Sequence, residues 1–147
     1  MEGQAGPSSP DTAFKALLKA FSLGLSTAPL GDLEDILLAL RAMRHDDVLI
    51  DRGEVRLLIR REDWIGAVRL LKRLETRQAL DQGLSVALLA GCLFKLRDPE
   101  WRRYGSQLLQ ESSSPTALSL VARFLQIPDD KTSEARTLIA QMVGSPA

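Results

Sequence analysis

The sequence predicts an all-α protein of about eight helices, stacked as antiparallel hairpins. Apolar residues recur at the 3.6-residue spacing of a helix along most of the 147 residues, and no stretch keeps a period of two. Leucine and alanine are abundant, while aromatic residues make up only 5% of the chain, a composition that favours helices over sheets. The breaks between apolar segments are short, so successive helices should pack against each other.

The expected helices follow a Gly-, Ser- and Pro-rich N-terminal segment, residues 1–11, which is predicted to be disordered. A helical domain should then occupy residues 12–127. A capping helix with its tail should occupy residues 128–147, after a Pro-Asp-Asp break. The apolar stripes that define the helices cover residues 14–25, 33–43, 48–60, 64–74, 84–94, 101–109, 117–124 and 135–142.

The segment DPEWRRYGSQLLQ, residues 98–110, opens the sixth of these helices. The carboxylate of Asp98 can accept hydrogen bonds from free backbone N–H groups, and Pro99 lacks the N–H that the first helical position leaves unpaired. Trp101 shares a helical face with Tyr104, which favours a core position over a binding site. The residues predicted to form the structural core are Trp64, Ala67, Leu71, Phe94, Trp101 and Gly105.

Composition and charge argue against several kinds of partner. Lys plus Arg and Asp plus Glu each total 19, so no net charge draws the chain to nucleic acid. No uncharged apolar stretch reaches the roughly 18 residues of a membrane span. The N-terminus lacks the pattern of a secretory signal. We therefore expect a cytoplasmic protein that does not span the membrane, with the periplasm as the alternative.

The residues that could carry chemistry do not converge on one site. His45, the single histidine, stands beside Asp46 and Asp47 at a helix end, where a positive side chain complements the helix dipole. Three adjacent residues there are poorly arranged to bind a metal. Cys92, the single cysteine, rules out an internal disulfide and is expected to be a packed thiol. We expect no enzyme activity, no metal and no cofactor.

An internal repeat is suggested by GEVRLLIRREDWIGAVRLLKRLE, residues 53–75. Ala67 aligns with the small packing residue in the second helix of a tetratricopeptide repeat, so the chain resembles a tetratricopeptide-like solenoid of helical hairpins. The repeat is degenerate. Ile36 and Arg103 fall where a small residue is expected, and Gly105 takes that place in the later pair. The spacing also departs from the usual repeat of about 34 residues.

The order of four segments resembles the Hrp-type family of small type III secretion proteins. They read LRAMRHDDVLID, IRREDWIGAVRLLKRLE, LSVALLAGCLFKLRDPEWRRYGSQLLQ and SPTALSLVARFL, and the similarity covers about residues 13–127. More distantly, the array resembles the tetratricopeptide-like chaperones that hold needle subunits in animal-pathogen type III systems. The resemblance implies a non-enzymatic component of bacterial type III secretion. It would act on export subunits as a chaperone or adaptor, or in the envelope, binding peptidoglycan and self-associating.

The first helix of each hairpin in a tetratricopeptide array lines a concave groove, where a partner would bind. Basic residues outnumber acidic ones between residues 41 and 77, so the groove should be apolar with a basic middle. Such a groove suits an acidic amphipathic helix of a needle or pilus subunit, with a small co-chaperone or a second copy as further partners. Alternatively, the basic residues form a solvated face, and several of the predicted groove residues belong to the core instead. The predicted groove residues are Leu18, Phe21, Leu25, Arg52, Arg56, Ile59, Arg60, Leu88, Cys92 and Lys95.

Overall fold

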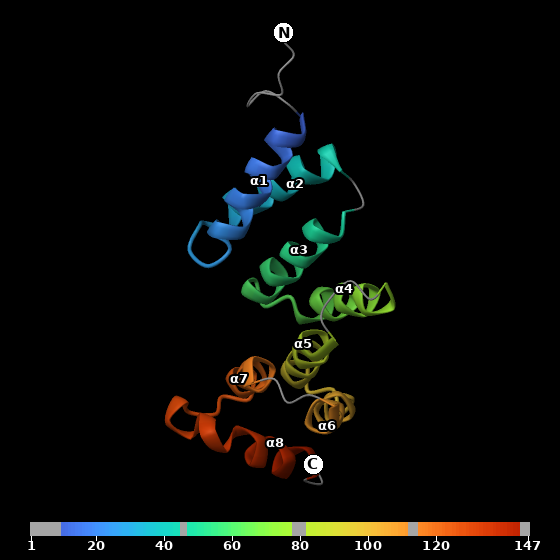
Figure 1. The fold of residues 1–147 in the computed structure, drawn as a ribbon, viewed down its shortest axis with the longest axis vertical. Helices are drawn as coiled ribbons and strands as arrows, with labels where there is room; N and C mark the ends of the chain where they lie inside the picture. The colour runs from blue at the N-terminus through green and yellow to red at the C-terminus, as the bar shows by residue number, and fades with distance from the viewer. Residues whose placement is uncertain (1–9, 45–46, 78–81, 112–114, 145–147) are drawn as a thin grey trace. The chain divides into compact units, whose positions relative to one another are not determined.

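The computed structural model describes residues 10–44, 47–77, 82–111 and 115–144, and all secondary structure in these ranges is helical (Figure 1). The described ranges hold eight α-helices and one short 3₁₀ helix, without a strand. The all-α prediction is therefore confirmed for this part of the chain. The helices divide into two compact units, which we call unit 1, up to Glu62, and unit 2, from Asp63 onward.

Within its described residues, unit 1 contains α1 (Pro10–Gly24), α2 (Leu30–Met43) and α3 (Val48–Arg60). Each of the three helices packs against the other two. Each presents an apolar face at helical spacing, and these faces meet in one hydrophobic cluster. The buried members of the cluster are Phe14, Phe21, Leu25, Leu33, Leu40, Ile50 and Leu57.

An arginine joins α2 to α3. Nη2 of Arg41 lies 2.5 Å from a carboxylate oxygen of Asp51 and 2.5 Å from one of Glu54, both on α3. Asp51 is only 1% exposed, so this pairing stabilises a charge that is removed from water. Burial lowers the pKa of Arg41, but the hydrogen bonds that it donates to Glu54 and Asp51 outweigh burial and raise the pKa. The guanidinium therefore stays charged.

The first helix begins earlier than the sequence predicts. The predicted disordered segment extends to residue 11, but α1 starts at Pro10. Proline suits the first helical position because it has no N–H to leave unpaired. Asp11 adds a negative charge to the first turn and pairs with Lys15 at 3.2 Å and Arg44 at 2.6 Å. The predicted segment thus ends two residues too late. Its first nine residues lie outside the described ranges, and the other domain limits stay predictions.

Unit 2 contains, in its described residues, α4 (Trp64–Thr76), α5 (Gln82–Lys95), α6 (Trp101–Glu111), α7 (Pro115–Phe124), η1 (Asp129–Glu134) and α8 (Ala135–Gly144). Helix α5 packs against α4, α6 and α7, and this central position explains why its sequence is apolar on most sides. No helix in the described part of the chain is long and apolar enough to cross a membrane. The buried hydrophobic residues of α5 are Val86, Ala87, Leu89, Ala90, Cys92 and Leu93.

The helices of unit 2 are packed as hairpins that stack on one another. Helix α5 packs against α6, and α7 packs against α8. The first helices of the two pairs, α5 and α7, pack together, and so do the second helices, α6 and α8. Stacking of this kind buries a core that continues from one hairpin to the next. It is consistent with the predicted repeat, while the specific likeness to a tetratricopeptide solenoid stays a prediction.

Two pairs of aromatic rings are in contact within the described part of unit 2. The rings of Trp64 and Phe124 meet edge-on with centroids 6.0 Å apart, and those of Phe94 and Trp101 meet in the same way at 5.2 Å. Phe124 also packs directly onto Gly91, where a Cβ atom would overlap the ring. Among the predicted core residues, Ala67, Leu71, Trp101 and Gly105 are buried, and Trp64 and Phe94 are half-buried.

Candidate functional site

The corner between α5 and α6 is shaped by the way α5 ends. The N–H of Arg97 donates to the carbonyl of Phe94, and the N–H of Asp98 donates to the carbonyl of Leu93. This pair of bonds is a Schellman motif, which requires a left-handed residue after the helix. Arg97 supplies that conformation with a φ of 59°. The chain therefore turns sharply at Arg97, and the side chains on either side of it are brought to one corner.

Asp98 stabilises the turn that precedes α6 by accepting hydrogen bonds. A carboxylate oxygen of Asp98 accepts a hydrogen bond from the N–H of Glu100 at 2.9 Å, and its backbone carbonyl accepts one from Trp101 at 3.1 Å. The N–H of Arg102 donates to the carbonyl of Pro99 at 3.1 Å. The sequence places the helix start at this aspartate and proline, and the structure shows the turn there, with α6 itself beginning at Trp101.

A cavity of about 600 Å³ opens at this corner, and we call it the corner pocket. Two aromatic side chains, Phe94 from the last turn of α5 and Trp101 from the first turn of α6, form its apolar part. Their edge-on contact, with an interplanar angle of 83°, holds the two rings against each other. The residues that line the pocket are Phe94, Lys95, Arg97, Pro99, Trp101 and Arg102.

Among the described residues of that lining are three cations and no carboxylate. The guanidinium carbon of Arg102 lies 5.9 Å from the centre of the Trp101 ring, near enough for a cation–π contribution. Nε of Arg102 is buried and has no hydrogen-bond partner in the part of the chain that the structure describes. A buried donor without an acceptor costs about 1–3 kcal/mol. The three cations make the described lining of the pocket electropositive.

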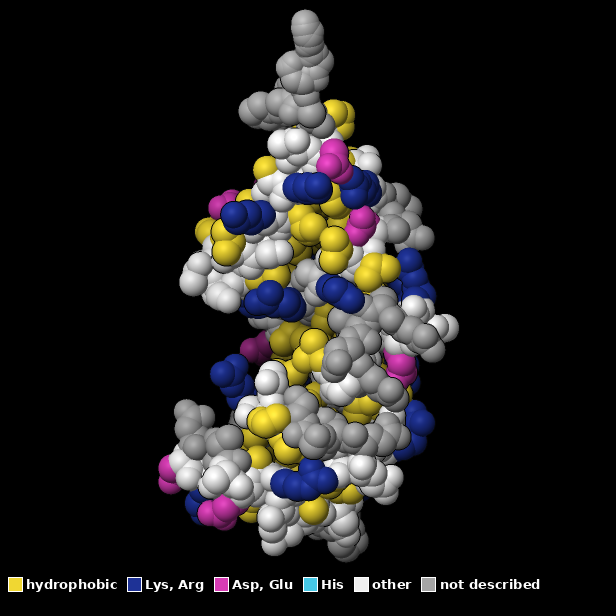
Figure 2. Space-filling model, in the orientation of Figure 1, with side chains coloured by type: hydrophobic (Ala, Val, Ile, Leu, Met, Phe, Trp, Pro, Cys, Tyr) yellow, Lys and Arg dark blue, Asp and Glu magenta, His cyan; other side chains and the backbone are white. Residues whose placement is uncertain are grey.

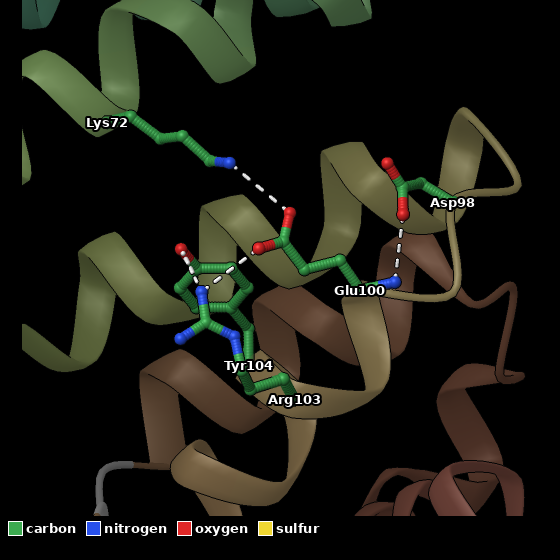
Figure 3. A network of polar contacts seen from close by, with 5 residues as sticks. All are labelled: Lys72, Asp98, Glu100, Arg103 and Tyr104. Atoms are coloured by element: carbon green, nitrogen blue, oxygen red, sulfur yellow. Dashed lines mark hydrogen bonds and ion pairs between the residues drawn. The ribbon is translucent and has the colours of Figure 1, made fainter.

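Glu100, which stands between two lining residues in the sequence, is held by Lys72 and Arg103, as Figure 3 shows. One carboxylate oxygen of Glu100 accepts a hydrogen bond from Nζ of Lys72 at 3.2 Å, and the other accepts one from Arg103 at 3.0 Å. Arg103 also donates to the Tyr104 hydroxyl at 3.0 Å. Burial, followed by the charge of Glu75, raises the pKa of Tyr104, so this hydroxyl stays protonated at neutral pH. This network keeps the Glu100 carboxylate occupied outside the pocket lining.

The predicted groove residues of unit 1 do not all reach a surface. Phe21 and Leu25 are 0% and 4% exposed in the core of the unit, so the structure places them in the core and not on a binding surface. The physical reason is the wide apolar face of α1, which is used up by packing against α2 and α3. Leu18, Ile59 and Arg60 are half-buried, and Arg52 and Arg56 are exposed. Arg60 donates a hydrogen bond to the backbone carbonyl of Leu25 at 3.2 Å.

Of the groove residues predicted in unit 2, Lys95 alone lines the corner pocket. Leu88 is half-buried on α5. Cys92 is 0% exposed, and burial raises its pKa to about 12, so the side chain is a neutral thiol enclosed in the core. The structure therefore places Cys92 in the core as well, because α5 is covered by three other helices.

Candidate metal ligands do not gather within the described residues. No group of three or more His, Cys, Asp or Glu side chains is placed to hold a metal ion there. His45 and Asp46 lie outside the described residues. Asp47 accepts a hydrogen bond from the N–H of Leu49 at 2.8 Å and so caps α3, which is the helix-starting role expected of an acid at this position.

The corner pocket brings together residues that the sequence reading treats separately. Phe94 and Trp101 are predicted as core, Lys95 as groove, and Arg97 and Arg102 carry no prediction. The available signal is the run FKLRDPEWRR, residues 94–103, in which cations alternate with aromatic rings around an Asp-Pro turn. Helical spacing cannot show that such a turn leaves a cavity, because the cavity depends on where the left-handed residue directs the chain.

Comparisons with known proteins agree with the family resemblance of the sequence. Residues 7–130 match the model of a family described as bacterial type III secretion protein (HrpB1_HrpK). No curated protein matches the chain. No solved structure matches it either.

Proposed function

The chain belongs to the HrpB1_HrpK family of bacterial type III secretion proteins, and from this premise we propose that it binds a helical export subunit as a chaperone or adaptor. The partner would be a needle or pilus subunit with an amphipathic helix that bears acidic residues. The observation that supports this partner is the corner pocket, whose described lining residues include two aromatic rings and three cations but no carboxylate. Its chemistry is complementary to an acidic and apolar helix face.

The size and composition of the corner pocket suit a protein side-chain anchor. Ligand pockets commonly have volumes of about 300–1,000 Å³, and the corner pocket, at about 600 Å³, falls within that range. Apolar contact with Phe94 and Trp101 would supply most of the affinity, because buried aromatic contacts dominate interfaces. Lys95, Arg97 and Arg102 would orient the partner and speed its association.

Unit 1 offers a second surface of similar chemistry. Arg52 and Arg56 lie one helical turn apart on α3, and both are exposed. Leu23 and Leu38 are 71% and 69% exposed on the same unit. On the face seen in Figure 2, Lys and Arg side chains lie among hydrophobic ones over the helices of unit 1. Exposed cations of this kind would steer an acidic partner toward the protein.

The proposed role is not catalytic. General acid–base catalysis needs a titratable group whose pKa lies near the working pH. The corner pocket is lined by lysine and arginine, and the Cys92 thiol is buried with a pKa of about 12. Binding without chemistry is therefore the simplest use of these side chains. Assays for hydrolysis of peptide, phosphate or glycan bonds should give no rate above the buffer.

Co-purification from a bacterium that expresses its type III apparatus tests the binding proposal. We expect the wild-type protein to retain a needle or pilus subunit, identified by mass spectrometry of the captured chains. Substitution Arg102→Met should reduce the captured amount, because it removes a pocket cation while keeping an apolar stem. Substitution Arg69→Met is the matched control, because Arg69 is an exposed arginine of unit 2 outside the pocket lining. Capture of no export subunit, or equal capture by both variants, contradicts the proposal.

The proposed compartment is the cytoplasm, where export subunits are held before secretion. Fractionation should recover the protein with cytoplasmic markers, and the partner subunit should be degraded in cells that lack it. The alternative within the same family is an envelope component that binds peptidoglycan and self-associates. Recovery in the periplasm together with sedimentation on isolated peptidoglycan would favour that alternative and exclude the chaperone role.

A further inference from the structure

We infer that the corner pocket binds one acidic side chain of the partner helix together with an apolar side chain from the next turn of that helix. The inference rests on the proposed function and names the chemistry that the pocket selects. It treats Arg97 and Arg102 as specificity-determining residues. Neither residue belongs to the groove that the repeat alignment predicts.

The cations of the pocket are arranged to bind a carboxylate. The guanidinium carbon of Arg102 lies 5.9 Å from the centre of the Trp101 ring, and both residues line the pocket. A carboxylate can accept two parallel hydrogen bonds from one guanidinium, and the half-buried Arg102 leaves part of its side chain accessible to such a ligand. Lys95 and Arg97 line the same cavity from the end of α5 and the turn. A neutral amide could accept a hydrogen bond but would leave three positive charges without a counter-charge.

The aromatic side chains of the pocket are the reason to expect an apolar side chain beside the acidic one on the partner helix. Side chains three or four residues apart on a helix lie about 5–6 Å from each other at their Cβ atoms. A cavity of about 600 Å³ has room for more than one such side chain. Phe94 and Trp101 would then contact the aliphatic residue while the cations hold the acid. The two requirements together define a leucine–acid pair on one helix face.

The polar network beside the pocket keeps it open to an external acid. Glu100 stands between the lining residues Pro99 and Trp101 in the sequence but is not itself among the described lining residues. Its two carboxylate oxygens are engaged by Lys72 and Arg103 instead. Lys72 therefore acts as a positioning residue. Its replacement would free Glu100 to compete with the partner.

Two pairs of substitutions separate the pocket from the fold. Arg97→Gly removes a pocket cation at a left-handed position where glycine is the favoured residue, so we expect it to abolish the contact without weakening the fold. Gln126→Gly makes the same backbone change at another left-handed position of unit 2, with a φ of 61°, outside the pocket lining. Arg102→Met and Arg69→Met form the second pair, for an arginine inside and outside the pocket.

The experiment is a titration of the full chain followed by the two tryptophan indole N–H signals in nuclear magnetic resonance spectra, assigned with a Trp64→Phe variant. The probe is an acetylated and amidated helical peptide of about 15 residues, with leucine and glutamate four positions apart on one face. Its control replaces that glutamate with glutamine. We expect the Trp101 signal to shift with the glutamate peptide, and the affinity to fall about tenfold or more for the glutamine peptide, for Arg97→Gly and for Arg102→Met.

The matched controls, Gln126→Gly and Arg69→Met, should bind the glutamate peptide as the wild type does, and the Trp64 signal should stay in place. The inference is overturned by equal affinity for the two peptides, by equal affinity of Arg97→Gly and Gln126→Gly, or by no shift of Trp101 at saturating peptide. If the peptide result is negative while an export subunit still co-purifies, the carboxylate inference fails and the proposed function stands. If the peptide binds but no export subunit co-purifies, the proposed function fails alone.

Discussion

At the scale of single residues, two glycines with opposite surroundings show what packing demands in unit 1. A Cβ atom on Gly53 would overlap the ring of Phe21, which is itself 0% exposed. A Cβ on Gly31 would meet nothing within 4 Å. We expect Gly53→Ala to lower the free energy of unfolding by about 1–3 kcal/mol, because the buried ring has little room to move.

The matched substitution Gly31→Ala should be neutral or raise the free energy of unfolding by up to about 1 kcal/mol, because alanine favours the helix. Chemical denaturation of both variants, followed by circular dichroism, measures the difference. Equal effects of the two substitutions would show that Phe21 does not pack on α3 as described.

The Cys92 thiol gives a second prediction at this scale. Burial raises its pKa from 9.0 to about 12, so the folded chain keeps the proton where the unfolded chain loses it. The unfolded state therefore binds fewer protons between these two values, and the free energy of unfolding should fall as pH rises above about 9. In the Cys92→Ala variant this contribution should be absent.

A thiol reagent gives an independent measure of the same burial. At pH 8 it should modify Cys92 slowly in the native protein and rapidly in denaturant. Rapid modification of the native protein would contradict the buried position.

Residue-level burial was partly predictable from spacing. Trp101 lies on the apolar face of its helix and is 6% exposed. The repeat alignment assigns Phe21 and Cys92 to a groove face, yet both are 0% exposed. A helix that packs against neighbours on more than one side has no free apolar face. Which sides of a helix are covered depends on tertiary packing. The periodicity of one segment gives no information about that packing.

At the scale of elements, strained left-handed backbone conformations occur just after the ends of helices. The non-glycine residues with positive φ in the described ranges are Glu62, Arg97 and Gln126, and each follows the end of a helix. A left-handed conformation costs a residue with a Cβ atom about 1–2 kcal/mol more than glycine, partly offset by the greater flexibility of glycine in the unfolded chain. The three turns adopt the left-handed conformation even though none of the three residues is glycine.

We therefore expect Arg97→Gly and Gln126→Gly each to raise the free energy of unfolding by about 1 kcal/mol. Urea denaturation at fixed pH measures this. The reverse change, Gly24→Ala, is not a useful comparison for these two substitutions. The added Cβ would lie only 3.0 Å from the Cβ of Ala28, so a steric clash would change the stability as well. Destabilisation by both substitutions would mean that the arginine and glutamine side chains contribute more than their backbone conformation costs.

The elements themselves were largely predictable, and the connections were not. Each predicted apolar stripe corresponds to an α-helix in the structure, because the 3.6-residue period extends over about three turns in most of them. The 3₁₀ helix Asp129–Glu134 has no apolar period and was not predicted. The corner pocket was missed for a similar reason. It arises from a turn, and turns depend on a few backbone conformations that leave little trace in hydrophobic spacing.

At the scale of the whole molecule, the predicted single helical domain over residues 12–127 does not indicate a division at Glu62 and Asp63. Apolar stripes continue on both sides of this point, so spacing gives no sign of a boundary. The boundary appears when packing is known, because each unit closes its own core. The family match, over residues 7–130, extends across both units. The matched region therefore includes most of each unit.

The division leads to a prediction about autonomous folding. Small domains bury a smaller fraction of their surface, and below about 70–80 residues a hydrophobic core rarely supplies more than about 3–5 kcal/mol. Unit 2, residues 63–147, exceeds that size and has a central helix, α5, covered by three others. Unit 1 ends at Glu62 and has three helices in its described residues. We expect a fragment of residues 63–147 to be helical by circular dichroism and to unfold cooperatively.

A fragment of residues 1–62 should unfold at a lower temperature than the unit 2 fragment, because its smaller core buries less apolar surface. Thermal unfolding of the two fragments at equal concentration compares them. The indole signals of Trp64 and Trp101 should keep their native positions in the unit 2 fragment, since the ring contacts of both tryptophans lie within that unit. A fragment of residues 63–147 without cooperative unfolding would show that its core is incomplete without unit 1.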